Sequence, residues 1–209
     1  VLHAYTMRNP NKKQALEQAL HLVQYMENNY GAQPSIKPNT FTYKTLMKCW
    51  IQSGEPNVAE SVEKVLIQME RLWKEGDYAV EPNNRIFNMV INAYAKSDDF
   101  FAARKAFDLL GRMKTSSKCQ PDIISYTSVM ECLSKSADPK AVQQAEELLD
   151  EAFRRYEETK DPALMPNLRT FTMAILTLAK NHGSVVKARA LLTQCMDLYI
   201  ETKNPLLLP

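Results

Sequence analysis

The feature that most constrains this chain is a short opening sequence that occurs four times in 209 residues. Each copy begins with proline followed by asparagine or aspartate, and a tyrosine or phenylalanine stands five residues after the proline. The four prolines, spaced 44, 39 and 45 residues apart, are Pro38, Pro82, Pro121 and Pro166. Self-similarity at a period of about 20 to 50 residues is typical of repeat proteins. The sequence therefore predicts an array of similar structural units.

Each unit has the pattern of two helices. The asparagine or aspartate is a favoured helix N-cap, and apolar residues then recur at spacings of three and four, as between Tyr43 and Trp50. Turn residues such as Ser53–Pro56 separate this first helix from a second one, which carries an apolar stripe such as Val62–Met69. A helical hairpin cannot bury its apolar faces alone, so neighbouring hairpins have to stack. We therefore expect an all-α fold, an α-solenoid of stacked helical hairpins.

The whole chain, residues 1–209, is expected to be one repeat array and a fragment of a longer protein. Its predicted parts are a partial repeat at 1–37 and repeats at 38–81, 82–120, 121–165 and 166–209. Val1 to Tyr5 would end the first helix of the partial repeat, and Gln14 to Tyr30 would form its second. Pro209 would open a further unit. Neither end carries the polar capping helix that a complete array needs, which favours excision from a longer array.

The composition of the chain argues against several classes of function. No apolar run approaches the roughly 20 residues of a membrane-spanning helix, so membrane insertion is not expected. The chain has four scattered cysteines and three dispersed histidines, which predict neither a disulfide framework nor a metal site. The acidic cluster Glu146–Glu151 lies at helical spacing and is interpreted as a solvated face. We therefore expect no enzyme, no catalytic residue, no cofactor and no small-molecule substrate.

The residue after each aromatic begins a mostly polar row, because residues four apart share one side of a helix. The four rows are Lys44, Lys48, Gln52; Asn88, Asn92, Lys96; Thr127, Glu131, Lys135; and Thr172, Leu176, Lys180. With the flanking Arg85 and Arg169, the first helices carry a charge of +6, and the rest of the chain carries −4. A basic stripe of this kind favours a nucleic-acid partner even when the net charge is only +2.

Four lysines are candidates to contact phosphate: Lys48, Lys96, Lys135 and Lys180. The last three occupy the same site in successive units, as a ladder along a phosphate backbone would require. The alternative is a solvated lysine that ends a helix and suits its dipole. The aromatics Tyr43, Phe87, Tyr126 and Phe171 could stack on bases, but they share the apolar stripe and are expected to pack in the core.

The repeated Pro-Asn/Asp opening, the lysine near the end of the first helix and the Ala-x-x-Leu-Leu pattern of the second helix together resemble the pentatricopeptide repeat (PPR) family. The units here are longer than is usual in that family. The resemblance implies a right-handed superhelix and binding of single-stranded RNA, one base per repeat. It also implies work on RNA processing, stability, editing or translation in mitochondria or plastids. A protein-binding scaffold of the same fold is the alternative.

The resemblance also assigns base-reading residues: Lys44, Asn83, Asn88, Asp122, Thr127, Asn167 and Thr172. Asn88 with Asp122 is similar to a uracil-reading pair, and Thr127 with Asn167 is similar to an adenine-reading pair. Lys44 with Asn83 matches no common pair, and Thr172 has no partner before the chain ends. Asn83, Asp122 and Asn167 could instead serve only as helix caps. The residues implied to flank the base are Phe41, Arg85, Ile124 and Arg169, of which only Ile124 is aliphatic, as the family favours.

Overall fold

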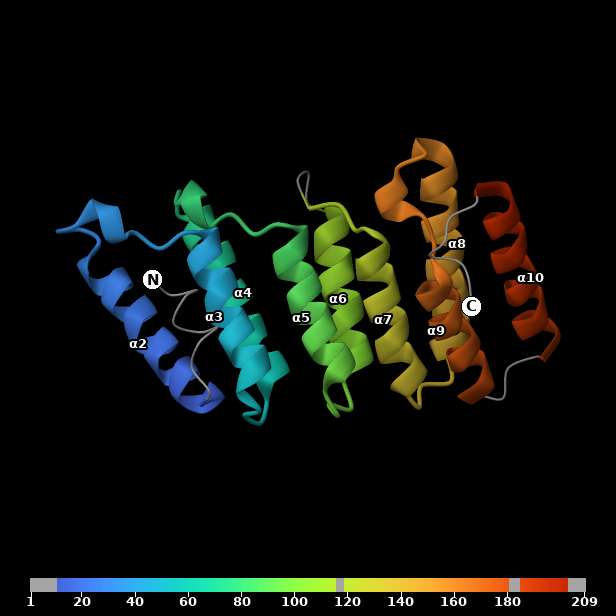
Figure 1. Cartoon of the computed structure of the whole chain (residues 1–209), viewed down its shortest axis with the longest axis horizontal. Helices are drawn as coiled ribbons and strands as arrows, with labels where there is room; N and C mark the ends of the chain where they lie inside the picture. Colours follow the sequence, from blue (N-terminus) through green and yellow to red (C-terminus); the bar gives the residue numbers. More distant parts are fainter. Residues whose placement is uncertain (1–10, 116–118, 181–184, 203–209) are drawn as a thin grey trace. The chain divides into compact units, whose positions relative to one another are not determined.

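The computed structural model describes residues 11–115, 119–180 and 185–202, except for the side chain of Glu201. Within these residues the chain forms nine α-helices and three short 3-10 helices, and no strand (Figure 1). The predicted all-α fold of helical hairpins is therefore confirmed. The chain divides into two compact units, Val1–Ala93 (unit 1) and Tyr94–Pro209 (unit 2). The helix expected at Val1 to Tyr5 and the unit expected to open at Pro209 lie outside the described residues.

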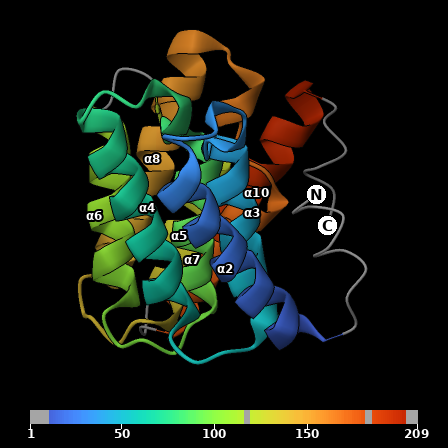
Figure 2. The ribbon, with the colours of Figure 1, turned by 90° about the vertical axis from the view of Figure 1, so that its left-hand side faces the viewer.

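Unit 1 is built on helices α2 (Lys12–Asn29), α3 (Thr40–Ser53) and α4 (Val58–Lys74). Helix α3 packs against both α2 and α4. Figure 2 views this unit from its α2 side, with α3 and α4 behind. Helix α2 covers most of the segment expected at 14–30. Helix α5 (Asn84–Lys96) begins in unit 1 and ends in unit 2.

Unit 2 continues with one hairpin after another. Its helices are α6 (Ala102–Thr115), α7 (Ile123–Lys135), α8 (Ala141–Thr159), α9 (Leu168–Lys180) and α10 (Val185–Thr202). Helix α7 packs against α6, α8 and α9, and α9 also packs against α8 and α10 (Figure 1). Two successive first helices, α7 and α9, therefore lie side by side, each with second helices packed against it.

The repeated opening sequence forms a reciprocal capping box at the start of the first helices. Asn39 Oδ1 accepts from the backbone N–H of Thr42 at 3.1 Å, and Thr42 Oγ1 accepts from the N–H of Asn39 at 3.3 Å. The same two bonds join Asp122 to Ser125 and Asn167 to Thr170. At α5 the third residue of the box is Ile86, which has no hydroxyl, and Asn83 Oδ1 only accepts from its N–H at 3.3 Å. The predicted capping role is thus observed at every opening.

The aromatic residue of each opening is buried, as predicted: Tyr43, Phe87, Tyr126 and Phe171. The two phenol groups need polar partners in the core. Tyr43 donates to Glu27 Oε1 at 2.6 Å, and Gln68 Nε2 donates to the same oxygen at 2.6 Å.

In unit 2 the phenol of Tyr126 donates to Glu151 Oε1 at 3.1 Å and accepts from Arg155 Nη1 at 3.0 Å. Burial raises the pKa of Tyr126 to about 12. Phe171 instead packs on Phe153, with ring centroids 5.7 Å apart.

Three 3-10 helices, η1 (Pro34–Ile36), η2 (Tyr78–Val80) and η3 (Pro162–Leu164), follow second helices and precede the next opening. Val80 and Leu164 are buried two residues before the proline. In unit 1, Thr40 Oγ1 donates to the carbonyls of Ala79 at 3.1 Å and Glu81 at 3.0 Å, which attaches η2 to α3.

Candidate nucleic-acid interface

In unit 1 the predicted polar row forms the exposed side of α3. Lys48 and Gln52 are exposed, and Lys44 is half-buried with its ammonium 5.3 Å from the centroid of the Phe41 ring. Phe41 is itself 51% exposed. The α3 row therefore presents two cations and an aromatic ring to solvent.

The start of α5 also lies in unit 1, and its row is less accessible. Arg85 is exposed and Asn92 is half-buried, but Asn88 is only 8% exposed. Asn83 is exposed beside its helix cap. Asn88 and Asp122, the predicted uracil-reading pair, belong to different units.

In unit 2 the exposed side of α7 contains Ile124, which is 57% exposed, the half-buried Glu131 and the exposed Lys135. Thr127 is only 5% exposed. On α9 the whole predicted row is exposed: Arg169, Thr172, Leu176 and Lys180. Lys96 is exposed at the end of α5. The hydroxyl of Thr172 donates to the Leu168 carbonyl at 2.8 Å, in its own helix.

Two cations of unit 2 are already engaged within the protein. Arg169 Nη2 lies 2.7 Å from Glu131 Oε2, so the arginine that flanks the α9 row is paired with the acid of the α7 row. The ammonium of Lys135 donates to the carbonyl of Ala95 in the last turn of α5. A cation at this place also suits the negative end of the helix dipole. The charges of these residues were predictable from the sequence, but their pairing was not, because the partners lie about 40 residues apart.

The structure links the predicted adenine-reading pair through a residue that sequence reasoning did not select. Thr127 Oγ1 and Thr170 Oγ1 are 2.9 Å apart and buried between α7 and α9. Thr170 Oγ1 also donates to Asn167 Oδ1 at 3.2 Å. Thr170 therefore bridges Thr127 and Asn167. A sequence signal was available, since Thr42, Ser125 and Thr170 hold the same place in three openings and Ile86 differs.

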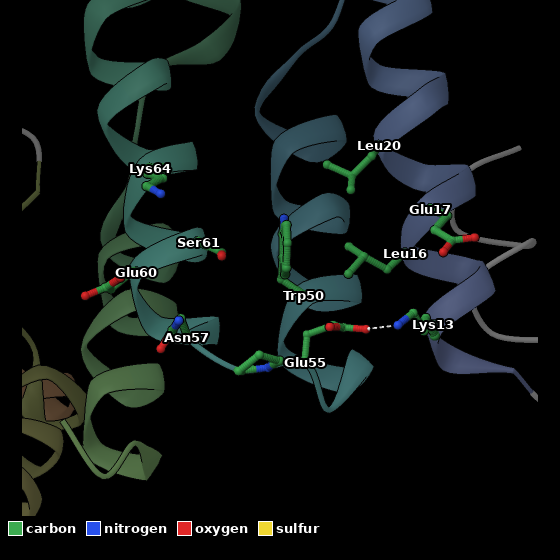
Figure 3. Close-up of a pocket in the computed structure, with 11 residues that line it drawn as sticks. Lys13, Leu16, Glu17, Leu20, Trp50, Glu55, Asn57, Glu60, Ser61 and Lys64 are labelled. Carbon is green, nitrogen blue, oxygen red and sulfur yellow. Dashed lines mark ion pairs between the residues drawn. The ribbon is translucent and has the colours of Figure 1, made fainter.

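A groove of about 400 Å³ lies elsewhere in unit 1, between α2 and α4, with Trp50 of α3 exposed to it (Figure 3). Leu16 and Leu20 line its α2 side. An ion pair of 3.0 Å between Lys13 and Glu55 closes one end. The groove thus combines an apolar floor with charged edges.

Other kinds of site are not seen in the described part of the chain. Among residues 11–115, 119–180 and 185–202, no helix is both long enough and apolar enough to cross a membrane. In the same residues no three His, Cys, Asp or Glu side chains gather as a metal ion would require. The buried Cys132 is held as a neutral thiol, because burial raises its pKa to about 12.

Comparison with known proteins identifies the repeat. The sequence model described as "PPR repeat" matches residues 85–117. Among curated proteins, pentatricopeptide repeat-containing protein At5g18475 of Arabidopsis thaliana is 29% identical over 115 residues, 54% of this chain and 21% of that protein. The chloroplastic pentatricopeptide repeat-containing protein At3g06430 of the same plant is 28% identical over 101 residues, 48% of this chain and 18% of that protein.

A third relative, pentatricopeptide repeat-containing protein At3g53170 of Arabidopsis thaliana, is 26% identical over 124 residues. That match covers 59% of this chain and 24% of the relative, so the matched segments span about a quarter or less of these longer proteins. The family match, the relatives and the helical hairpins agree: the chain contains a PPR repeat at residues 85–117 and is similar over about half its length to pentatricopeptide repeat-containing proteins.

Proposed function

We propose that this chain is a non-catalytic module that binds single-stranded RNA through its first helices. Proteins of the PPR family generally bind RNA in organelles, and one relative is named chloroplastic. The proposal extends to this chain a role in organellar RNA processing, stability, editing or translation, in mitochondria or plastids. The observation that carries it is the set of cations exposed along the first helices: Lys48, Arg85, Lys96, Lys135, Arg169 and Lys180.

The proposed binding unit is the repeat, with the boundaries 38–81, 82–120, 121–165 and 166–209 and a partial repeat at 1–37. Cations at the exposed sides of the first helices supply sequence-independent attraction to phosphate. We assign this role to Lys48, Lys96, Lys135 and Lys180. Base contacts are assigned to the residues after the aromatics together with the capping residue of the next opening. Capping uses only Oδ1 of Asn167, so it leaves the amide Nδ2 available for a base.

The test is RNA binding by a variant that changes Lys96, Lys135 and Lys180 together to alanine. Its matched control changes Arg104, Arg154 and Arg189 to alanine, three exposed cations on the second helices α6, α8 and α10. We expect the lysine variant to bind short single-stranded RNA more weakly and with a shallower salt dependence, because phosphate contacts are lost. The arginine control should bind as wild type does. Equal binding by the lysine variant and wild type would refute the phosphate assignment.

A protein-binding scaffold is the second candidate, and the groove at Trp50 is the observation that favours it. A half-buried tryptophan between apolar side chains is a common anchor for a peptide side chain. Among the charged residues that line the groove, Glu17, Glu55 and Glu60 outnumber Lys13 and Lys64, so a basic peptide fits better than RNA. Changing Trp50 to alanine should abolish peptide capture without affecting RNA binding. A loss of RNA binding in a folded variant would argue against separate surfaces.

A further inference from the structure

One end of unit 2 carries exposed apolar side chains at three successive helix junctions, and we call it the apolar end. At the bottom of Figure 1 it includes the turn from α5 to α6, the turn from α7 to α8, and the start of α10. Phe100 and Phe101, in the first turn, are 81% and 56% exposed. Pro139 is exposed in the second turn, and Val185 and Val186 are exposed at the start of α10. Clustered exposed apolar residues are typical of a surface that binds a protein or a membrane.

Hydrogen bonds fix the turn that presents the two phenylalanines. Asp99 Oδ1 accepts from the backbone N–H of Phe101 at 2.8 Å, and Asp99 Oδ2 pairs with Lys105 Nζ at 2.9 Å. The carbonyl of Asp99 accepts from the N–H of Ala102 at 3.0 Å. The rings of Phe100 and Phe101 contact each other edge to face, with centroids 5.2 Å apart. The pair is therefore held at the surface in a defined conformation before any partner binds.

Cations surround these apolar side chains. Those exposed at the same junctions are Lys96, Arg104, Lys135, Lys140 and Lys180. The acids described at these junctions are Asp98, Asp99 and Asp138, of which Asp99 is neutralised by Lys105. The apolar end therefore has an excess of three positive charges. Charge complementarity favours an anionic partner.

We propose that the apolar end of unit 2 attaches the chain to the surface of an anionic lipid membrane. The phenylalanine rings enter the headgroup region, and the surrounding cations attract the lipid phosphates. A bilayer accepts apolar side chains from three separate junctions without a pocket shaped for each, so it fits this end better than a protein groove does. Attachment of this kind lies on the membrane and needs no helix that spans it.

The inference is independent of the proposed RNA binding, although the two share some cations. Lys96, Lys135 and Lys180 are also assigned to RNA phosphate. Phe100, Phe101, Arg104 and Lys140 have no assigned role in RNA binding, so changes to these residues separate the two activities.

Cosedimentation of the full chain with lipid vesicles tests the attachment. Vesicles of pure phosphatidylcholine are compared with vesicles of equal parts phosphatidylcholine and phosphatidylglycerol. Wild type should sediment with the mixed vesicles and stay in solution with the neutral ones. Changing Phe100 and Phe101 together to serine should weaken binding to mixed vesicles at least about tenfold, because two apolar rings are lost. The control Tyr78→Ser removes a ring that is 77% exposed on η2 in unit 1, and it should bind as wild type does.

A second variant tests the cations. Changing Arg104 and Lys140 together to alanine should weaken binding to mixed vesicles about fivefold for each cation removed. Its matched control changes Arg154 and Lys160 to alanine, two exposed cations toward the other end of α8. This control has the same net charge and should bind the vesicles as wild type does.

Loss of vesicle binding in the phenylalanine variant, with its helix content unchanged by circular dichroism, supports the inference. Equal binding by that variant and wild type would overturn it, as would failure of wild type to bind mixed vesicles. A wild-type dimer that the phenylalanine variant abolishes, without vesicle binding, would also overturn it, because the rings would then pack against a second copy. Failure of wild type to bind RNA would overturn the proposed function and leave the membrane inference standing.

Discussion

The α3 row of unit 1 and the α7 row of unit 2 occupy the same place in their repeats but present different chemistry. The α3 row begins with Lys44 and Lys48 and contains no acid. The α7 row begins with the buried Thr127, and its acid, Glu131, pairs with Arg169 of the next helix at 2.7 Å. The next opening supplies Ile86 in unit 1, where unit 2 has the hydrogen-bonding Thr170.

This difference indicates a division of labour within the proposed function. Cations that protein groups do not neutralise attract phosphate regardless of sequence, so unit 1 is suited to affinity. A fixed set of hydrogen-bond donors and acceptors discriminates between bases, so the Thr127–Asn167 site of unit 2 is suited to specificity. One repeat architecture can therefore serve both tasks through a few side chains on the first helices.

The largest expected effect comes from removing the cations of unit 1. Changing Lys44, Lys48 and Arg85 to alanine should lower RNA affinity by roughly 100-fold at about 0.1 M salt, because each phosphate contact contributes a salt slope of about 0.7. A smaller loss of RNA affinity is expected when Lys96, Lys135 and Lys180 are changed together, since the ammonium of Lys135 already donates to the Ala95 carbonyl. Titrations at several salt concentrations measure both. An equal loss in the two variants would contradict the division of labour.

The control for that comparison lies on the second helix of the same unit. Lys64, Arg71 and Lys74 are exposed on α4, and their replacement by alanine changes the net charge equally. RNA affinity should change little in this control. A comparable loss would mean that total charge, and not its place on the first helix, determines binding.

The next effect concerns the tyrosines that both units bury. Tyr126→Phe removes two hydrogen bonds and should lower the free energy of unfolding by about 2 kcal/mol, whereas Tyr43→Phe removes one and should cost about 1 kcal/mol. Urea unfolding at neutral pH measures both costs. Equal losses of unfolding free energy in the two variants would show that the hydrogen bond from Arg155 to Tyr126 does not stabilise unit 2.

The stability of unit 2 should also depend on alkaline pH through Tyr126. Burial raises its pKa to about 12 in the folded state, above the ordinary value near 10. The folded state thus holds the phenol proton more tightly than the unfolded state does. The contribution of the protonated phenol to the free energy of unfolding is therefore complete below about pH 10 and is lost as the pH rises through about 12. Between these pH values, the free energy of unfolding should fall more steeply for wild type than for Tyr126→Phe. Parallel curves would contradict the burial of this phenol.

A smaller effect follows from neutralising the acid of the α7 row. Glu131→Gln releases Arg169 for phosphate and makes the charge of this row more like that of α3. RNA affinity should rise about fivefold at about 0.1 M salt, which corresponds to one added phosphate contact. The base preference at the Thr127 site should stay the same. Unchanged affinity would mean that Arg169 does not face the RNA backbone.

Local sequence patterns were sufficient to predict much of the fold. The Pro-Asn/Asp openings gave the helix starts, because a capping box is completed within four residues, and the apolar spacing gave the burial of Tyr43, Phe87, Tyr126 and Phe171. Pairing between repeats was not predictable in this way. The contacts of Glu131 with Arg169 and of Lys135 with Ala95 depend on how adjacent first helices pack. The bridging role of Thr170 was missed for the same reason.

The central claim is that the exposed sides of the first helices bind RNA, and photocrosslinking tests it most directly. Single-stranded RNA containing 4-thiouridine is irradiated with the full chain, and the modified peptides are identified by mass spectrometry. The account predicts adducts within α3, α5, α7 and α9, next to the exposed Lys48, Arg85, Ile124 and Arg169. Adducts concentrated on the second helices or around Trp50 would contradict it.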